Sequence, residues 1–153
     1  MQDMPEPDSS GCVIGFDYGL KRIGVAVGQV ITGTATPLKV LHNQPASLWD
    51  GINALLAEWE PRGIVVGLPL AMDNSDTEMS LQCRKFARRI HGRSGLPVYL
   101  QDERLTSRVA DSRFSQMRAA GEKKQKHAAG KDSIAAQVML EDWLANPGEP
   151  IGA

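Results

Sequence analysis

The sequence has 153 residues, of which 42% are hydrophobic and 23% are charged, with a formal net charge of −1. This length predicts one domain that can bury a core without disulfides, and no apolar run is long enough to cross a membrane. The acidic beginning, MQDMPEPDSSG, is unlike a secretory signal, and Cys12 and Cys83 lack disulfide-framework or metal-ligand spacing. We therefore expect a cytoplasmic protein with free thiols, and neither a membrane protein nor a disulfide-rich secreted one.

Three short strands are predicted first along the chain. Residues 1–10 have no periodicity, and we expect a disordered tail there, a domain over residues 11–146 and a C-terminal tail over 147–153. Apolar or β-branched runs then predict strands at Cys12–Asp17, Ile23–Gly28 and Thr32–Leu41. Their short connections favour an antiparallel meander.

The pattern then changes to helices that alternate with single strands. Ser47 is predicted to cap a first helix, which Pro61 ends. The elements that follow are strands at Gly63–Leu68 and Val98–Gln101 and helices at 77–91, Thr106–Arg118 and Asp132–Leu144. This order predicts an α/β fold with a mixed five-stranded sheet, three antiparallel strands and then two parallel ones, flanked by helices.

Positive charge is concentrated in one part of the chain. The stretch from Arg84 to Lys131 holds 13 of the 17 Lys and Arg residues and only 4 of the 18 Asp and Glu residues. Such a stretch is typical of proteins that bind polyanions, although a solvated helix face would show the same charges. Trp49, Trp59 and Trp143 fall at core spacing, so no stacking platform for single-stranded bases is expected.

Three acidic residues lie at the ends of predicted elements. Asp17 closes the first strand, where open α/β sheets bind ligands, although an Asp that caps the following turn would look the same. Glu103 follows the strand Val98–Gln101, where a surface turn is the alternative. Asp132 opens the last helix on the face of Ala135, Ala136, Met139 and Trp143, so it is expected to point at the sheet.

A cluster of inward carboxylates is costly unless a cation neutralises it. Carboxylate oxygens select Mg²⁺ or Mn²⁺, and two such ions can promote in-line displacement at phosphorus. If the three segments meet, Asp17, Glu103 and Asp132 could hold these ions. Spacing along the chain does not show that they meet.

Several blocks of sequence resemble one known family. They are GFDYGLKRIGVAVGQ, ITGTATPL, IVVGLPLAMD, KFARRIHG, LQDERLTS and GKDSIAAQVMLEDWL, and the similarity covers essentially residues 12–144. In this order they resemble the YqgF family, also called RuvX-like, a branch of the ribonuclease H-like superfamily. The resemblance implies a ribonuclease H-like fold with Asp17, Glu103 and Asp132 as catalytic carboxylates that hold two Mg²⁺ or Mn²⁺ ions. It also implies a nuclease that processes the 5′ end of pre-16S rRNA, or a Holliday junction resolvase.

With this resemblance, nearby cations gain expected roles. Lys21 and Arg22 after Asp17, Arg104 beside Glu103 and Lys131 beside Asp132 could hold the scissile phosphate. Lys123, Lys124 and Lys126, in the basic segment 119–131, could contact flanking phosphates.

The choice of substrate stays open. RNA, possibly within pre-ribosomal particles, is favoured over DNA, because a resolvase should be a dimer and no exposed apolar stripe calls for one. A monomer or a weak homodimer is expected. A non-catalytic RNA-binding factor of ribosome assembly is a further alternative, but it would not need three acids.

Overall fold

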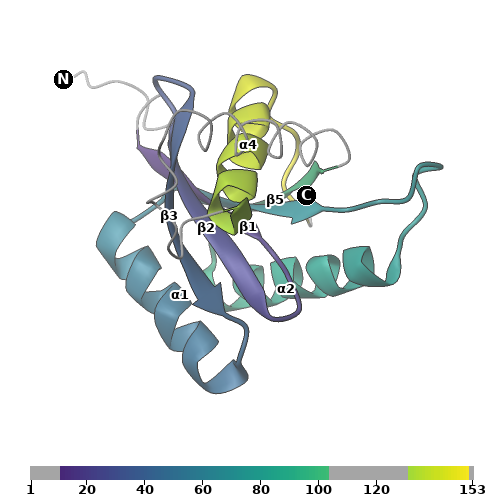
Figure 1. The fold of residues 1–153 in the computed structure, drawn as a ribbon. Helices are drawn as coiled ribbons and strands as arrows, with labels where there is room; N and C mark the ends of the chain where they lie inside the picture. The colour runs from purple at the N-terminus through teal and green to yellow at the C-terminus, as the bar shows by residue number, and fades with distance from the viewer. Residues whose placement is uncertain (1–10, 104–130, 152–153) are drawn as a thin grey trace, which may run out of the picture.

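The computed structural model describes residues 11–103 and 131–151 and shows one mixed sheet (Figure 1). Its strand order is β3-β2-β1-β4-β5. The first three strands pair antiparallel, whereas β4 is parallel to β1 and β5 is parallel to β4. The strands are β1 (Cys12–Asp17), β2 (Arg22–Gln29), β3 (Thr34–His42), β4 (Gly63–Leu68) and β5 (Val98–Asp102). The predicted mixed five-stranded sheet is confirmed.

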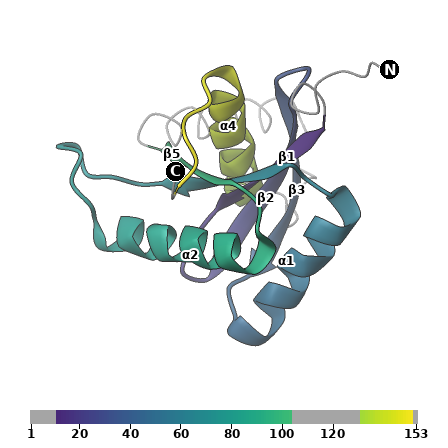
Figure 2. The same cartoon turned by 180° about the vertical axis from the view of Figure 1, so that it is seen from behind.

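Helices cover both faces of the sheet, as the two opposite views show (Figures 1 and 2). The helices α1 (Pro45–Trp59) and α2 (Glu78–Ser94) lie on one face, and α4 (Lys131–Ala145) lies on the other. The helix predicted at Thr106–Arg118 and the tail predicted at residues 1–10 lie outside the described residues. Within the described part of the chain, no helix is long and apolar enough to span a membrane.

The ends of the helices follow from local chemistry. The prediction that Ser47 caps α1 was wrong, because the helix begins two residues earlier at Pro45, whose ring presets a helical φ at the first turn. Thr77 caps α2 by accepting a hydrogen bond from the Ser80 backbone N–H (2.9 Å). This helix continues past the predicted end at residue 91 and closes at Gly95, whose φ of 72° suits glycine.

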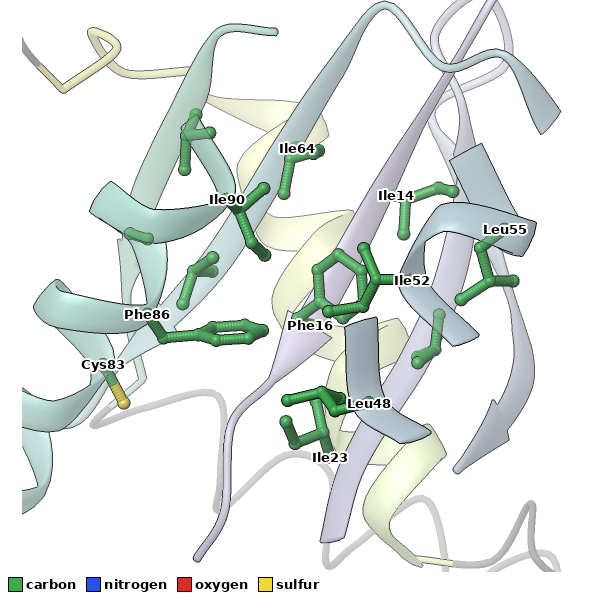
Figure 3. Packing of buried hydrophobic residues seen from close by; sticks show 14 of the residues in the cluster. Ile14, Phe16, Ile23, Leu48, Ile52, Leu55, Ile64, Cys83, Phe86 and Ile90 are labelled. Carbon is green, nitrogen blue, oxygen red and sulfur yellow. The ribbon is translucent and has the colours of Figure 1, made fainter. Parts of the chain in front are cut away.

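Alternation along the strands divides the core into two layers. Ile14 and Phe16 of β1 are fully buried on the side of α1 and α2, where Phe86 packs against Phe16 (Figure 3). Val13 belongs to the layer beneath α4. Because neighbouring strand residues point to opposite faces, the odd-numbered residues of β1 face α4.

Glycines let α4 approach the sheet closely. A Cβ at Gly15 would lie 3.3 Å from three atoms of Leu140, and a Cβ at Gly28 would lie 2.9 Å from Leu144 Cδ1. The face of α4 that carries Met139 and Trp143 is buried against the sheet, which confirms the predicted inward face. Beyond the helix, the backbone N–H of Ile151 donates to the carbonyl of Val98 (2.7 Å).

Candidate functional site

Asp17 lies at the carboxyl end of β1, on the face that α4 covers. It is the last residue of the strand and pairs with Gly24 of β2. The turn that follows is tight, since a Cβ at Gly19 would lie 2.5 Å from the carbonyl oxygen of Arg22. Asn43 donates a side-chain hydrogen bond to the Gly19 carbonyl (2.8 Å) and so holds this turn. The backbone that follows Asp17 is therefore held in a tight turn at the edge of the sheet.

Glu103 comes to the same edge from the other side of β4. Its backbone N–H donates to the carbonyl of Leu68 (3.1 Å), which places the residue directly after β5. Its side chain lies over Gly67, where a Cβ would come within 2.8 Å of Glu103 Cγ. Since β4 separates β1 from β5, Glu103 reaches Asp17 across Gly67, and the two side chains form a hydrogen bond. A glycine at position 67 makes this contact possible.

The pair of carboxylates is electrostatically strained. Burial raises the pKa of Glu103 well above its ordinary value, and the negative charges of Asp17 and Asp102 raise it further. The hydrogen bond between the two side chains also raises the pKa of Glu103. Burial, with the charges of Glu103 and Asp17, also raises the pKa of the Cys83 thiol to about 12. Negative charge at this edge thus raises both pKa values, an effect that a bound cation would oppose.

The third predicted acid, Asp132, is the second residue of α4, and its side chain lies outside the described residues. Leu140 lies opposite Gly15, and Trp143 shares a layer with Val13 further back along β1. The helix therefore runs antiparallel to β1, and its beginning points toward the end of the strand that carries Asp17. Among residues 11–103 and 131–151, no three His, Cys, Asp or Glu side chains form a metal-binding group. That all three acids converge stays a prediction.

The predicted substrate-binding cations are only partly described. Lys21 is exposed in the turn after Asp17, and Arg22 is exposed at the start of β2. The Lys21 carbonyl accepts a hydrogen bond from the Asn43 backbone N–H (2.9 Å). Lys131 begins α4, but its side chain lies outside the described residues. The remaining predicted cations, Arg104, Lys123, Lys124 and Lys126, lie outside the described residues entirely.

Gly67 is the part of the site that the sequence analysis missed. In the apolar run GIVVGL it was counted only as a residue of a buried strand. A glycine inside a strand weakens it and often marks a close approach of another group. That signal was present in the sequence, but it did not identify Glu103 as the group that approaches.

Comparison with known proteins assigns the family. The family model described as "RuvX: Holliday junction resolvase" matches residues 11–146. The chain belongs to the RuvX family. A relative from Aeromonas salmonicida, named "Putative pre-16S rRNA nuclease", is 45% identical over 137 residues, which cover 89% of this chain and 96% of the relative. A relative of the same name from Alcanivorax borkumensis is 49% identical over 136 residues, 87% of this chain and 95% of its own.

Solved structures confirm the fold of this RuvX family member. RuvC of Thermus thermophilus, in complex with Holliday junction substrate, is similar with a TM-score of 0.58 over 92% of this chain and 99% of that chain, at 15% identity. The Holliday junction resolvase of fowlpox virus is similar with a TM-score of 0.53 over 88% of this chain and 98% of that chain, at 11% identity. These likenesses confirm the predicted ribonuclease H-like fold.

Proposed function

We propose that this protein is a metal-dependent nuclease that hydrolyses phosphodiester bonds of nucleic acid, with the 5′ end of pre-16S rRNA as its substrate. The observation that carries the proposal is the contact of Glu103 with Asp17 across Gly67. A contact between two acids at the carboxyl edge of the sheet is costly for the fold and suits a ligand-binding role. The names of the relatives support the rRNA substrate.

The two acids fit a divalent cation. Both offer hard oxygen ligands, which select Mg²⁺ or Mn²⁺, and burial and the charge of Asp17 raise the pKa of Glu103, an effect that a bound cation would oppose. Asp17, Glu103 and Asp132 would hold one or two such ions. When bound, these ions would activate water and stabilise the leaving oxygen of an in-line displacement.

The other residues of the proposed site bind and orient the substrate. Lys21 and Arg22 are exposed beside the turn that Asn43 holds, so we assign them to the scissile phosphate beside Asp17. We assign the same role to Arg104 and Lys131, and contacts to flanking phosphates to Lys123, Lys124 and Lys126. Pre-ribosomal particles in the cytoplasm would be the place of action.

Resolution of four-way DNA junctions is the second candidate function. The description of the family model and the fold shared with RuvC favour it. Since a junction has two strands to cut symmetrically, this function needs a dimer. A non-catalytic role in ribosome assembly would use the basic residues but would not require the contact between Asp17 and Glu103.

Cleavage assays with both substrates test the proposal. A labelled pre-16S rRNA fragment and a four-way DNA junction are incubated with Mg²⁺ or Mn²⁺, with wild type and with Asp17→Asn. We expect RNA cleavage by a monomeric wild type and a loss of at least about 100-fold in Asp17→Asn, because even outer-shell partners of metal ligands cost about 10–100-fold. Cleavage of the junction alone, by a dimer, would favour the resolvase. No cleavage of either, or equal cleavage by Asp17→Asn, would refute the nuclease.

A further inference from the structure

A second charged surface lies on the face of the sheet opposite α4, the face that carries both α1 and α2 (Figure 1). Arg93 and Arg89 of α2 both lie over the ring of Trp49 of α1 in cation–π contact, with guanidinium carbons 4.2 Å and 5.4 Å from the ring centroid. Lys85 lies one turn earlier on the same stripe of α2. We call Trp49, Lys85, Arg89 and Arg93 the Trp49 surface.

The ring of Trp49 is held firmly from below. It is only partly exposed, and its centroid lies 6.1 Å from that of Phe86, a buried residue of the core. Trp143 is buried in the opposite layer, as its spacing predicted, but Trp49 keeps a surface on which other groups stack. Trp49 packs against the core, in agreement with its spacing, and its ring also lies beneath two arginine side chains. Core spacing alone did not show that the ring lies at the rim.

Stacking prepares the two arginines to bind an anion. A guanidinium group holds its N–H donors in one plane, where a phosphate can accept two of them, and the cation–π contact limits where each group can lie. The ring also restricts the long arginine side chains, so less conformational entropy is lost when a phosphate binds. The Trp49 surface is thus preorganised for phosphate oxygens.

The charges of the surface have no compensating acid in the described structure. On the neighbouring stripe, Arg84 pairs with Asp76 (2.9 Å). Lys85, Arg89 and Arg93 are exposed and form no ion pair with residues of 11–103 or 131–151. Like charges four residues apart on a helix destabilise it. An anionic partner would remove this repulsion.

The surface is continuous with the turn that carries the candidate site. A hollow of about 70 Å³ is lined by Tyr18, Asn43, Trp49, Lys85 and Arg89, among others. Tyr18 follows Asp17 directly, and its ring lies 4.7 Å from that of Phe86. A chain that leaves the carboxylate pair can therefore pass over Tyr18 to the arginines.

The spacing of the cations suits a nucleic-acid strand. The Cα atoms of residues four apart on a helix are separated by about 6 Å along its axis, so those of Lys85, Arg89 and Arg93 extend over about 12 Å. This interval is similar to that between neighbouring phosphates of an extended single strand. We propose that the Trp49 surface binds the single-stranded flank of the substrate next to the cleaved bond, an inference that rests on the proposed nuclease function. Trp49 acts as a positioning residue for the arginines.

Salt-dependent binding tests the arginines. Binding of a labelled oligouridylate is measured in EDTA at several salt concentrations, for wild type and Arg89→Gln/Arg93→Gln. Each lost single-strand phosphate contact lowers the slope of log K against log salt by about 0.7, so we expect a fall of about 1.4. The control Lys39→Gln/Arg88→Gln removes two exposed charges elsewhere, since Arg88 lines a different groove with Arg84 and Leu100. Equal slopes for the test variant and wild type, or an equal fall in the control, would overturn the proposal.

Substitution of the ring tests the positioning role. Trp49→Leu keeps every charge but removes the cation–π contacts, and we expect affinity to fall about tenfold with a smaller change of slope than in the arginine variant. Trp49→Phe, which retains an aromatic face, should recover most of this affinity. Wild-type affinity in Trp49→Leu, or no recovery in Trp49→Phe, would refute positioning by the ring.

Cleavage separates this inference from the proposed function. Two substrates are compared, one without the single-stranded flank next to the cleaved bond and one with a long flank. For Arg89→Gln/Arg93→Gln we expect the wild-type rate of cleavage on the first substrate and a KM above that of wild type on the second. If wild type cleaves neither, the proposed nuclease fails, whereas the binding experiment in EDTA still decides whether this surface holds a single strand. If the variant cleaves both as wild type does, the nuclease stands and the Trp49 surface does not serve it.

Discussion

Gly67→Ala tests whether the site depends on the path of Glu103 across β4. A Cβ at this position would lie 2.5 Å from Glu103 Cδ and 2.8 Å from Cγ, whereas non-bonded carbon atoms prefer about 3.5–4.0 Å. The Glu103 side chain must therefore retreat by about 1 Å from Asp17. Gly67 is not among the glycines with positive φ, so alanine fits the backbone.

Gly67→Ala should lower the rate of cleavage and leave the free energy of unfolding almost unchanged. A misplacement of about 1 Å at a catalytic group can cost about 100-fold in rate, which corresponds to about 2.7 kcal/mol in the activation free energy. The atoms that must move belong to a flexible side chain, so the fold can adapt. Alanine also restricts the unfolded chain, which adds about 0.4–1 kcal/mol to the free energy of unfolding where strain is absent.

Single-turnover cleavage of the pre-16S rRNA fragment and thermal unfolding measure the two effects separately. The matched control is Gly92→Ala, because a Cβ at Gly92 of α2 meets nothing within 4 Å. The control should gain about 1 kcal/mol of helix stability and cleave at the wild-type rate. Wild-type cleavage and Mg²⁺ affinity in Gly67→Ala would show that contact between Glu103 and Asp17 is not needed, and our account of the site would be wrong.

Three further predictions concern stability and reactivity. Because the pKa of Glu103 is raised in the folded state, the stability of the metal-free protein should fall as pH rises from the ordinary glutamate range through the raised pKa. Glu103→Gln should therefore unfold at a higher temperature than wild type at neutral pH. Equal unfolding curves for the two proteins across this pH range would contradict this prediction. Gly28→Ala places a Cβ 2.9 Å from Leu144 and 3.0 Å from Leu140, which should force α4 away from β2. We expect the free energy of unfolding, measured in urea, to fall by about 1–3 kcal/mol. An unchanged midpoint of unfolding would argue against this packing. Cys83 is buried and its thiol has a pKa of about 12. A disulfide exchange reagent at pH 8 should therefore modify Cys83 only as fast as the protein unfolds. Rapid modification of the native protein would instead show that the thiol is accessible.

Much of the fold could be predicted because its signals are local. The predicted strand Cys12–Asp17 agrees with β1, since an apolar run that ends in a polar residue needs no distant partner to be recognised. The inward face of α4 was equally visible, because the spacing of Ala136, Met139 and Trp143 follows the helical period. The start of α1 was misplaced because Ser47 resembles a cap, while Pro45 already satisfies the geometry of the first turn.

The sequence alone also determined which acids end their strands, but only the tertiary structure decided that two of them touch. Asp17 and Glu103 are far apart along the chain, and their strands are not neighbours, because β4 lies between β1 and β5. Their contact depends on strand order, on the face that each residue takes in its strand and on the missing side chain of Gly67. In the same way, Trp49 has the spacing of a core residue, and only the packing of α1 beside α2 places two arginines on its ring. Periodicity describes one element at a time, whereas a site is made where several elements meet.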